Sequence, residues 1–337
     1  MNQPLTPDVH RVTRVRLAAG LAVLALALIA ACAGTGDQHD ELRLTVMSFN
    51  VWGAGGNDGR SIDDTVAVIR HVNPDLVGLQ EVQAESSDCT EAFCPPFGAS
   101  RAGEIARSLG YYVYEQQQEN AALWANAVIS RFPIQDATPN ELGVILQIQG
   151  RRVGVFNIHA TDFPYQPYQA LGIAYGSAPY LQTAPELVAA ANQARGEAIT
   201  LLLEEIAIAD SLDVIFITGD FNEPSHRDWT ERAAKLGVHP MSVAWPATRR
   251  LEQAGFKDTY RALFPDEIAM PGFTWTPTTA LDDPNDHHDR IAYVFVRGSD
   301  AQIESAQVVG EALVDSGSGI SRWPSDHRAV VARIVIP

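Results

Sequence analysis

The sequence feature that most constrains the fold is the apolar, β-branched run of residues 214–218, which ends in Gly219 and is followed at once by Asp220 and Asn222. A run of this length and composition predicts a buried strand in a sheet that is covered on both faces. In open α/β sheets, ligands bind at the carboxyl ends of the strands. We therefore expect the carboxylate and the carboxamide to leave the strand at the edge of a cleft, although Asp and Asn are also common in ordinary turns.

Polar side chains stand at the ends of other predicted strands as well. Three apolar runs, at residues 42–49, 75–79 and 152–158, lead to polar side chains. These are the amide of Asn50, the carboxylate of Glu81 and the imidazole of His159. The complete set is Asn50, Glu81, His159, Asp220, Asn222, Asp289, Asp326 and His327. A lone histidine at a strand end is more often a hydrogen-bonded structural residue than a catalytic one. The whole set, in contrast, suits a hard divalent cation together with proton transfer.

Helical segments separate these runs. Residues 61–72 predict an amphipathic helix with Ser61 as its N-cap, and residues 186–209 are rich in Ala and Leu over about six turns. Residues 144–148 and 152–158 predict a β-hairpin. The alternation of strands and helices predicts a layered α/β architecture.

The N-terminus predicts a targeting signal and not a part of the fold. Three arginines precede an apolar run of residues 17–31, which is too short to span a membrane comfortably. Small residues then precede Cys32, an arrangement that resembles the lipobox of bacterial lipoproteins. We therefore expect residues 1–31 to be a signal peptide, Cys32 to carry a lipid, and residues 32–41 to be a flexible tether. The alternatives are an ordinary secretory signal and an uncleaved anchor.

The expected lipid places the protein outside the cytoplasm at the cell membrane, with secretion as the alternative. In such a compartment Cys89 and Cys94, which stand close together in a polar loop, predict a local disulfide. A metal-binding pair is the competing interpretation, but it lacks neighbouring His or further Cys ligands. Residues 42–337 suffice for one large domain, which we expect to be monomeric.

The formal charge of −17 limits the partners of this chain. It offers no basic field that would steer the protein toward nucleic acid, so it disfavours a dedicated DNA-binding role. A divalent cation would supply positive charge locally instead.

Residues 161–185 form a long segment of tyrosines that Pro and Gly interrupt. Loops of this length in compact domains are commonly functional or disordered. We expect a structured loop beside the cleft, in which Tyr165 and Tyr168 contact the substrate. The alternative is a surface flap that is packed by its own tyrosines.

Seven short motifs carry a resemblance to a known family. They are Ser48-Phe49-Asn50, Leu79-Gln80-Glu81, Ser130-Arg131-Phe132-Pro133-Ile134, Asn157-Ile158-His159, Gly219-Asp220-Phe221-Asn222, Asp289-Arg290-Ile291 and Ser325-Asp326-His327. In this order they resemble the motifs of the endonuclease/exonuclease/phosphatase superfamily, which includes pancreatic-type deoxyribonucleases, apurinic endonucleases, neutral sphingomyelinases and inositol polyphosphate 5-phosphatases. The resemblance spans residues 43–336 and implies a four-layer α/β/β/α sandwich, with two packed mixed β-sheets flanked by helices.

The resemblance also implies a metal-dependent phosphoesterase. Glu81 would be the principal ligand of Mg²⁺, helped by Asn50 and Asp326, with Mn²⁺ as the other candidate metal. His327 would activate a water molecule for in-line attack on phosphorus, and Asp220 would orient that water or a catalytic histidine.

Other motif residues would hold the substrate or the catalytic groups. His159 and Asn222 would hold the phosphate oxygens as charge develops, Asp289 would fix an imidazole by hydrogen bonding, and Arg131 would contact the substrate. Some family members use a further acidic or tyrosine residue between the motifs of Glu81 and His159. Three residues are candidates for it without a deciding feature, namely Tyr112, Glu119 and Trp124. Three histidines match none of the motifs, namely His226, His287 and His288.

The resulting prediction is hydrolysis of a phosphodiester or phosphomonoester by an activated water molecule. An extracellular nuclease is one alternative. A catalytically inactive binding module on the same fold is another, and it would predict loss of the charged set. A serine hydrolase would need a Gly-x-Ser-x-Gly sequence at a strand end, whereas Gly317-Ser318-Gly319 stands in a loop.

Overall fold

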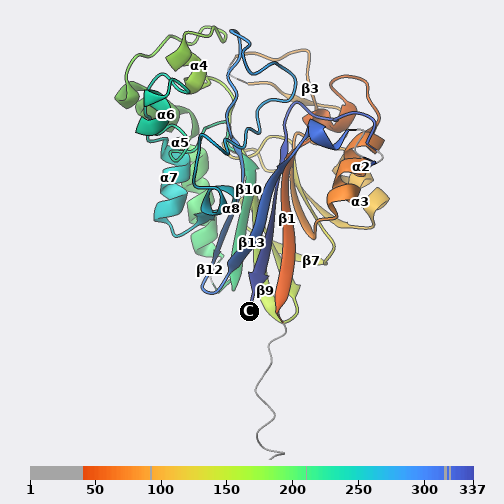
Figure 1. Ribbon diagram of the computed structural model, residues 1–337. Coiled ribbons are helices and arrows are strands. Elements are labelled where there is room, and N and C mark those ends of the chain that lie inside the picture. Colours follow the sequence, from red (N-terminus) through yellow and green to blue (C-terminus); the bar gives the residue numbers. More distant parts are fainter. Residues whose placement is uncertain (1–40, 92, 210, 315–316, 319) are drawn as a thin grey trace, which may run out of the picture. The chain divides into compact units, whose positions relative to one another are not determined.

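Two six-stranded β-sheets form the centre of the domain in the computed structural model (Figure 1). The structure describes residues 41–337 except residues 92, 210, 315–316 and 319, and residues 42–336 form one compact unit. The predicted signal peptide 1–31, the predicted lipid site Cys32 and all but the last residue of the predicted tether 32–41 lie outside the described residues. None of the described helices is both long and apolar enough to cross a membrane.

The first sheet places the strands nearest the two ends of the domain side by side. Its order is β13 (Gln302–Val309), β14 (Ala329–Ile336), β1 (Leu42–Asn50), β2 (Leu76–Gln80), β6 (Asn126–Ser130) and β5 (Tyr112–Gln116). β1 is antiparallel to β14 and parallel to β2, so that Asn50 lies opposite Gln80.

The second sheet repeats this plan. Its order is β11 (Lys257–Asp258), β12 (Ala292–Gly298), β10 (Val214–Asp220), β9 (Arg151–His159), β8 (Gly143–Ile148) and β7 (Ile134–Ala137). β10 is parallel to β9, with Asp220 opposite His159. The predicted hairpin is present as the antiparallel pair of β8 and β9. The short strands β3 (Ala84–Glu85) and β4 (Pro96–Phe97) pair separately in the disulfide loop.

Three apolar layers hold the sheets and the helices together. Residues such as Leu44 and Phe216 pack between the two sheets. The outer face of the first sheet packs against α2 (Ile62–Val72) and α3 (Ala102–Leu109), and that of the second sheet against α5 (Ala184–Ile208) and α7 (Pro246–Gln253). In Figure 1 these helices lie to the right and to the left of the strands. The predicted four-layer sandwich is therefore confirmed.

Side-chain caps fix where the predicted helices begin. The Ser61 side chain accepts a hydrogen bond from the backbone of Asp63 at the start of α2. Thr183 and Glu186 form a reciprocal capping box at the start of α5. Three helices are short, namely α4 (Gln166–Leu171), α6 (Glu231–Lys235) and α8 (Thr259–Leu263).

The apolar residues that precede β6 do not extend this strand, which begins at Asn126. The Asn126 side chain accepts a hydrogen bond from the backbone N–H of Trp124 at 2.9 Å, and Ala125 has a positive φ of 50°. These features make a turn ahead of β6, which leaves the Trp124 side chain on the wall of the cavity described below.

The two parallel pairs bring the strand ends together. β1 contacts β10, and β2 contacts β9, across the interface between the sheets. The carboxyl ends of all these strands therefore meet at one edge of the sandwich, as expected for a site at the ends of parallel strands. This edge is the upper one in Figure 1, where the long loops gather.

Candidate active site

Asn50 connects the carboxylates that the two sheets contribute. Its Nδ2 donates to Glu81 Oε1 at 2.7 Å and to Asp220 Oδ2 at 3.1 Å. Its Oδ1 accepts from the backbone N–H of Trp52 at 3.0 Å. Because a backbone N–H can only donate, the oxygen must face Trp52 and the amide nitrogen must face the carboxylates. In this orientation Asn50 positions Glu81 and Asp220 relative to each other, and its expected role as a metal ligand stays a prediction.

The buried carboxylate of Glu81 could hold a cation. Its side chain is buried, and its Oε2 has no hydrogen-bond partner among the described residues. Burial, and then the charge of Asp220, raise the pKa of Glu81 to about 8, although the hydrogen bond from Asn50 acts in the opposite direction. The backbone of Glu81 has a φ of 56°, which is unusual for a side chain with a long stem and is typical of strained functional positions.

Asp326 completes a group of three carboxylates with Glu81 and Asp220. Burial raises the pKa of Asp326 to about 7, the charge of His327 lowers it, and the charges of Glu81 and Asp220 raise it further. Buried carboxylates in such a group are the donors that a divalent cation would neutralise. An all-oxygen set suits Mg²⁺ or Mn²⁺, so the residues present fit the expected metal.

His327 lies against Asp220 at the edge of this group. Its Nε2 is 3.4 Å from Asp220 Oδ2. Ser325 holds the segment in place, because its Oγ accepts from the backbone N–H of His327 at 3.0 Å and donates to the backbone oxygen of Asn50 at 2.7 Å. The Trp275 ring packs beside the imidazole, with 4.9 Å between ring centroids. These contacts fix His327 relative to the acidic group.

His159 and Asn222 form a second pair beside Glu81. Asn222 Nδ2 lies 3.3 Å from His159 Nε2 and donates to the backbone oxygen of Ala160 at 3.0 Å. His159 Nδ1 lies 3.3 Å from the backbone oxygen of Trp124. A carbonyl oxygen only accepts, so Nδ1 carries the proton and Nε2 accepts from Asn222. Nε2 also lies 3.8 Å from Glu81 Oε1, so the pair adjoins the carboxylates.

Asp289 is held by two aromatic side chains. Tyr165 donates its hydroxyl to Oδ2 at 2.8 Å, and Trp229 donates its indole N–H to Oδ1 at 2.9 Å. The imidazole that it approaches is that of His287, with 4.0 Å between Nε2 and Oδ1. The imidazole beside Asp289 is therefore not a motif histidine, which the sequence interpretation did not anticipate.

His287 and the buried His239 make a hydrogen-bonded pair and not a ready metal site. Their ligand atoms and that of Asp289 lie within 4.8 Å of one another. The facing nitrogens are 3.1 Å apart and the ring centroids 5.3 Å apart, so the rings point nearly end to end. A direct N–H···N bond needs this geometry, whereas two rings that share a cation converge at an angle.

The Tyr-rich segment forms the wall of a cavity of about 680 Å³ over the catalytic residues. Tyr165 and Tyr168 line it, as predicted, but their hydroxyls donate to Asp289 and Asp286. The segment is anchored by Arg195 of α5, a buried residue whose guanidinium donates to the backbone oxygens of Thr161, at 2.9 Å, and Pro164, also at 2.9 Å. The opposite wall includes the loop in which the structure joins Cys89 to Cys94 by a disulfide.

Arg131 lies far from this cavity, and the prediction that it contacts the substrate is wrong. β6 runs antiparallel to β2 and pairs Ser130 with Leu76, the first residue of β2. Arg131 therefore stands at the opposite end of the sheet from Glu81. There it donates to the backbone oxygen of Pro74 at 3.0 Å and to the Tyr111 hydroxyl at 2.9 Å.

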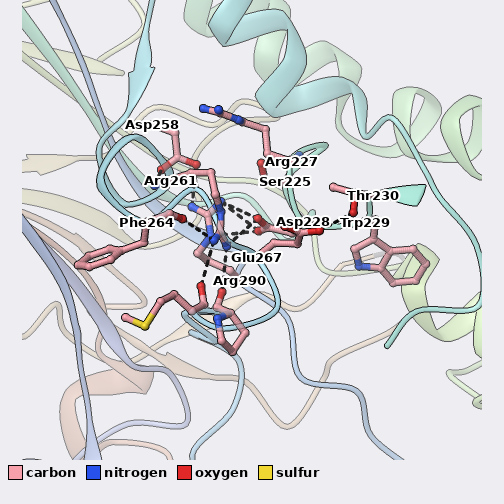
Figure 2. A network of polar contacts seen from close by, with 12 residues as sticks. Ser225, Arg227, Asp228, Trp229, Thr230, Asp258, Arg261, Phe264, Glu267 and Arg290 are labelled. Carbon is pink, nitrogen blue, oxygen red and sulfur yellow. Dashed lines mark hydrogen bonds and ion pairs between the residues drawn. The ribbon is translucent and has the colours of Figure 1, made fainter. Parts of the chain in front are cut away.

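A buried network of charges next to Asp289 was not anticipated from the sequence. Figure 2 shows the Asp228 carboxylate facing the guanidinium groups of Arg261 and Arg290. Its carboxylate lies 2.8 Å from Arg261 and 3.0 Å from Arg290, and Arg290 lies 2.7 Å from Asp258. Arg261 also donates to three backbone oxygens, namely those of Phe264, Met270 and Pro271. The network fixes the backbone that carries Asp289.

Asn157 joins the two sheets directly beneath the site. Its Nδ2 donates to the backbone oxygen of Leu79 at 2.9 Å and to Gln116 Oε1 at 2.8 Å, and its Oδ1 accepts from Gln80 at 2.6 Å. The motif that ends at His159 contains this residue, but its partners could not be read from a single strand.

Comparisons with known proteins agree with this geometry. The family model described as "Endonuclease/Exonuclease/phosphatase family" matches residues 47–327. A relative from Caenorhabditis elegans, named "Uncharacterized protein F14F9.5", is 28% identical over 306 residues, which cover 86% of this chain and 90% of that protein.

Solved structures share the fold at low sequence identity. TDP2 from D. rerio, complexed with a single-strand DNA product, has a TM-score of 0.52 and 15% identity and covers 87% of this chain and 98% of its own. The endonuclease/exonuclease/phosphatase from Beutenbergia cavernae DSM 12333 has a TM-score of 0.50 and 18% identity. The match covers 87% of this chain and 71% of that one. Because the family model spans nearly the whole described domain, this chain belongs to the endonuclease/exonuclease/phosphatase family.

Proposed function

We propose that this protein is a divalent-metal-dependent hydrolase of phosphoesters that uses an activated water molecule. The observation that carries the proposal is the buried, unpartnered Oε2 of Glu81 beside Asp220 and Asp326. A group of this kind is costly to maintain in a fold unless a cation binds it. Family membership supports phosphoester hydrolysis as the reaction.

Glu81 and Asp326 would hold the metal, with Asn50 orienting Glu81 by its 2.7 Å hydrogen bond. Mg²⁺ or Mn²⁺ bound there would neutralise charge on the phosphate and polarise the attacked phosphorus. Asp220 Oδ2 lies 3.4 Å from His327 Nε2 and would stabilise the imidazolium that forms when this nitrogen takes up a proton.

The reaction is a substitution at phosphorus. His327 Nε2 accepts a proton from a water molecule, whose oxygen forms a new bond to phosphorus. The bond between phosphorus and the alcohol oxygen breaks, and the alcohol oxygen leaves with the electron pair and takes a proton from solvent. When the His159 ring is protonated, its Nε2 donates to the phosphate oxygens that gain negative charge, and the Asn222 Nδ2 hydrogen that faced it is free to do the same.

The test is hydrolysis by the full-length chain in detergent, with Mg²⁺ or with chelator. Suitable substrates are bis-p-nitrophenyl phosphate, p-nitrophenyl phosphate and plasmid DNA. We expect metal-dependent turnover that Glu81→Gln and His327→Ala abolish. Asp136→Asn, which removes an exposed carboxylate on β7, serves as the matched control and retains activity. Turnover that survives chelation, or that survives Glu81→Gln, contradicts the proposal.

A nuclease is the second candidate, because the D. rerio TDP2 structure holds a single-strand DNA product. The formal charge of −17 disfavours long nucleic acid as the substrate. Cleavage of plasmid DNA at a rate above that of the small diester would favour the nuclease. The inactive binding module requires loss of the charged set, and every member of that set is present.

For its location we propose a monomeric lipoprotein outside the cytoplasm, attached to the membrane through Cys32, with secretion as the alternative. The support is the N-terminal sequence described above. Cys32→Ser should abolish incorporation of labelled palmitate and release the enzyme from the membrane fraction. Labelling that persists in this variant contradicts the proposal.

A further inference from the structure

Five residues form an outer pocket in the cavity, beyond the buried catalytic groups. They are Glu85, Trp124, Asp162, Phe163 and Tyr175, and all are exposed or half-buried on the cavity wall. Glu85 comes from the disulfide loop, and three of the others come from the Tyr-rich segment. The two walls touch where Ser177 donates to Glu91. The outer pocket is therefore a defined part of the cavity and not a gap between mobile loops.

Apart from two histidines, the ionisable side chains on the wall of the cavity are acidic or are tyrosines or cysteines. Among the described residues that line it there is no Lys or Arg. Burial, and then the charge of Asp162, raise the pKa of Glu85. The negative potential thus continues from the catalytic carboxylates into the outer pocket, where it attracts cations and repels additional phosphates.

The aromatic rings of the outer pocket are suited to the same kind of ligand. The Tyr175 ring packs edge-on against Phe163, with 5.4 Å between centroids. The Tyr175 hydroxyl donates to the Asp162 carboxylate, which increases the electron density of the ring. A cation is attracted to the face of an aromatic ring, and methylated ammonium groups are well-known ligands of aromatic cages.

Packing of the Tyr-rich segment alone explains these features less well. Arg195 and the capped start of α5 already hold the segment. Packing does not require carboxylates beside half-exposed rings, nor a lining without any basic residue in the described part of the chain.

We propose that the outer pocket binds a positively charged amine group on the substrate, so that the substrate is an ester of phosphocholine or phosphoethanolamine type. The proposal rests on the proposed phosphoesterase function and specifies its substrate. The metal would receive the phosphate, while Glu85, Asp162 and the rings would receive the ammonium group. The same chemistry occurs in lipid headgroups and in soluble glycerol esters.

The test uses two esters that differ by one charge. p-Nitrophenyl phosphocholine carries a trimethylammonium group, and p-nitrophenyl 3,3-dimethylbutyl phosphate carries a neutral tert-butyl group of the same shape. The full-length chain should hydrolyse the choline ester with a kcat/KM about tenfold higher, the effect expected for a partly desolvated cation over aromatic rings. The double variant Glu85→Gln/Asp162→Asn should lose this preference and keep its rate on the neutral ester, whereas Asp136→Asn should keep both.

The possible failures are distinguishable. Equal rates on the two esters overturn the inference and leave the proposed function standing. If neither ester is hydrolysed, the proposed function fails for this class, and calorimetric titration with tetramethylammonium decides the inference by itself. Binding that the double variant abolishes supports the outer pocket, and absence of binding overturns it. A comparison of phosphatidylcholine vesicles with glycerophosphocholine then separates the lipid source from the soluble one.

Discussion

Replacing Glu81 by glutamine should stabilise the fold while abolishing catalysis. Burial raises the pKa of Glu81 from its ordinary value of 4.5 to about 8, so the folded protein binds this proton more tightly than the unfolded chain does. The stability contributed by the neutral carboxyl is fully present below pH 4.5 and is lost as the pH rises toward 8. Without metal, the wild-type protein should therefore become less stable across this window.

The magnitude follows from the distance between the two pKa values. The interval from 4.5 to about 8 corresponds to at most about 5 kcal/mol of unfolding free energy. We expect Glu81→Gln to recover about 2–4 kcal/mol at pH 8, because the variant also loses the charged acceptor of the Asn50 hydrogen bond. Below pH 4.5 the variant and the wild-type protein should unfold alike.

The assay is denaturant unfolding at pH 5 and pH 8, with chelator or with Mg²⁺. Mg²⁺ at about one hundred times its dissociation constant should add about 2.7 kcal/mol to the wild-type protein at pH 8 and nothing to the variant. Glu223→Gln is the matched comparison, because burial raises the pKa of Glu223 to about 7 but this residue does not line the cavity. Its effect should not depend on Mg²⁺. A Glu81→Gln protein no more stable than wild type at pH 8 in chelator would refute the reasoning.

Three further predictions concern other residues. His327→Ala should lower kcat by about 10²–10⁴-fold without changing Mg²⁺ affinity measured by calorimetry, and a large loss of metal affinity would contradict its role as a base. Arg290→Met should cost about 3–5 kcal/mol of unfolding free energy, because it removes the ion-pair partner of the buried Asp258 and leaves Asp228 with Arg261 alone. Denaturant unfolding measures this cost, and a loss below about 1 kcal/mol would show that the network contributes little. Arg131→Ala should leave both kcat and KM unchanged, and a raised KM would return this residue to the site.

The sequence predicted the parts of the structure that depend on single strands and their direction. Apolar runs located the buried strands, and polar residues at their ends located Glu81, His159 and Asp220 at one edge, because the strands that carry them belong to parallel pairs. The four-layer arrangement followed from the family motifs, which occur in the same order in this chain.

The side-chain positions that could not be predicted depend on contacts between residues that are distant in the chain. Arg131 was misplaced because β6 runs antiparallel to β2, which sends its end to the opposite edge. The Asn50 amide nitrogen faces the carboxylates because the amide oxygen accepts a hydrogen bond from the backbone N–H of Trp52. Tyr165 reaches a residue 124 positions away in Asp289. A local sequence pattern does not predict such contacts. An Arg inside an Ala-rich helix, such as Arg195, does indicate that the side chain has a buried polar partner.

The place of β14 has a consequence for when the enzyme can become active. This last strand lies between β1 and β13 and pairs with β1 from Leu42 to Ser48. Asp326 and His327 come just before it, and Ser325 reaches back to Asn50 across 275 residues. A chain in which β14 has not yet paired with β1 therefore has not brought His327 and Asp326, the proposed base and one proposed metal ligand, to the other strand ends. Assembly of the proposed site thus depends on the pairing of these two strands, which are far apart in the sequence.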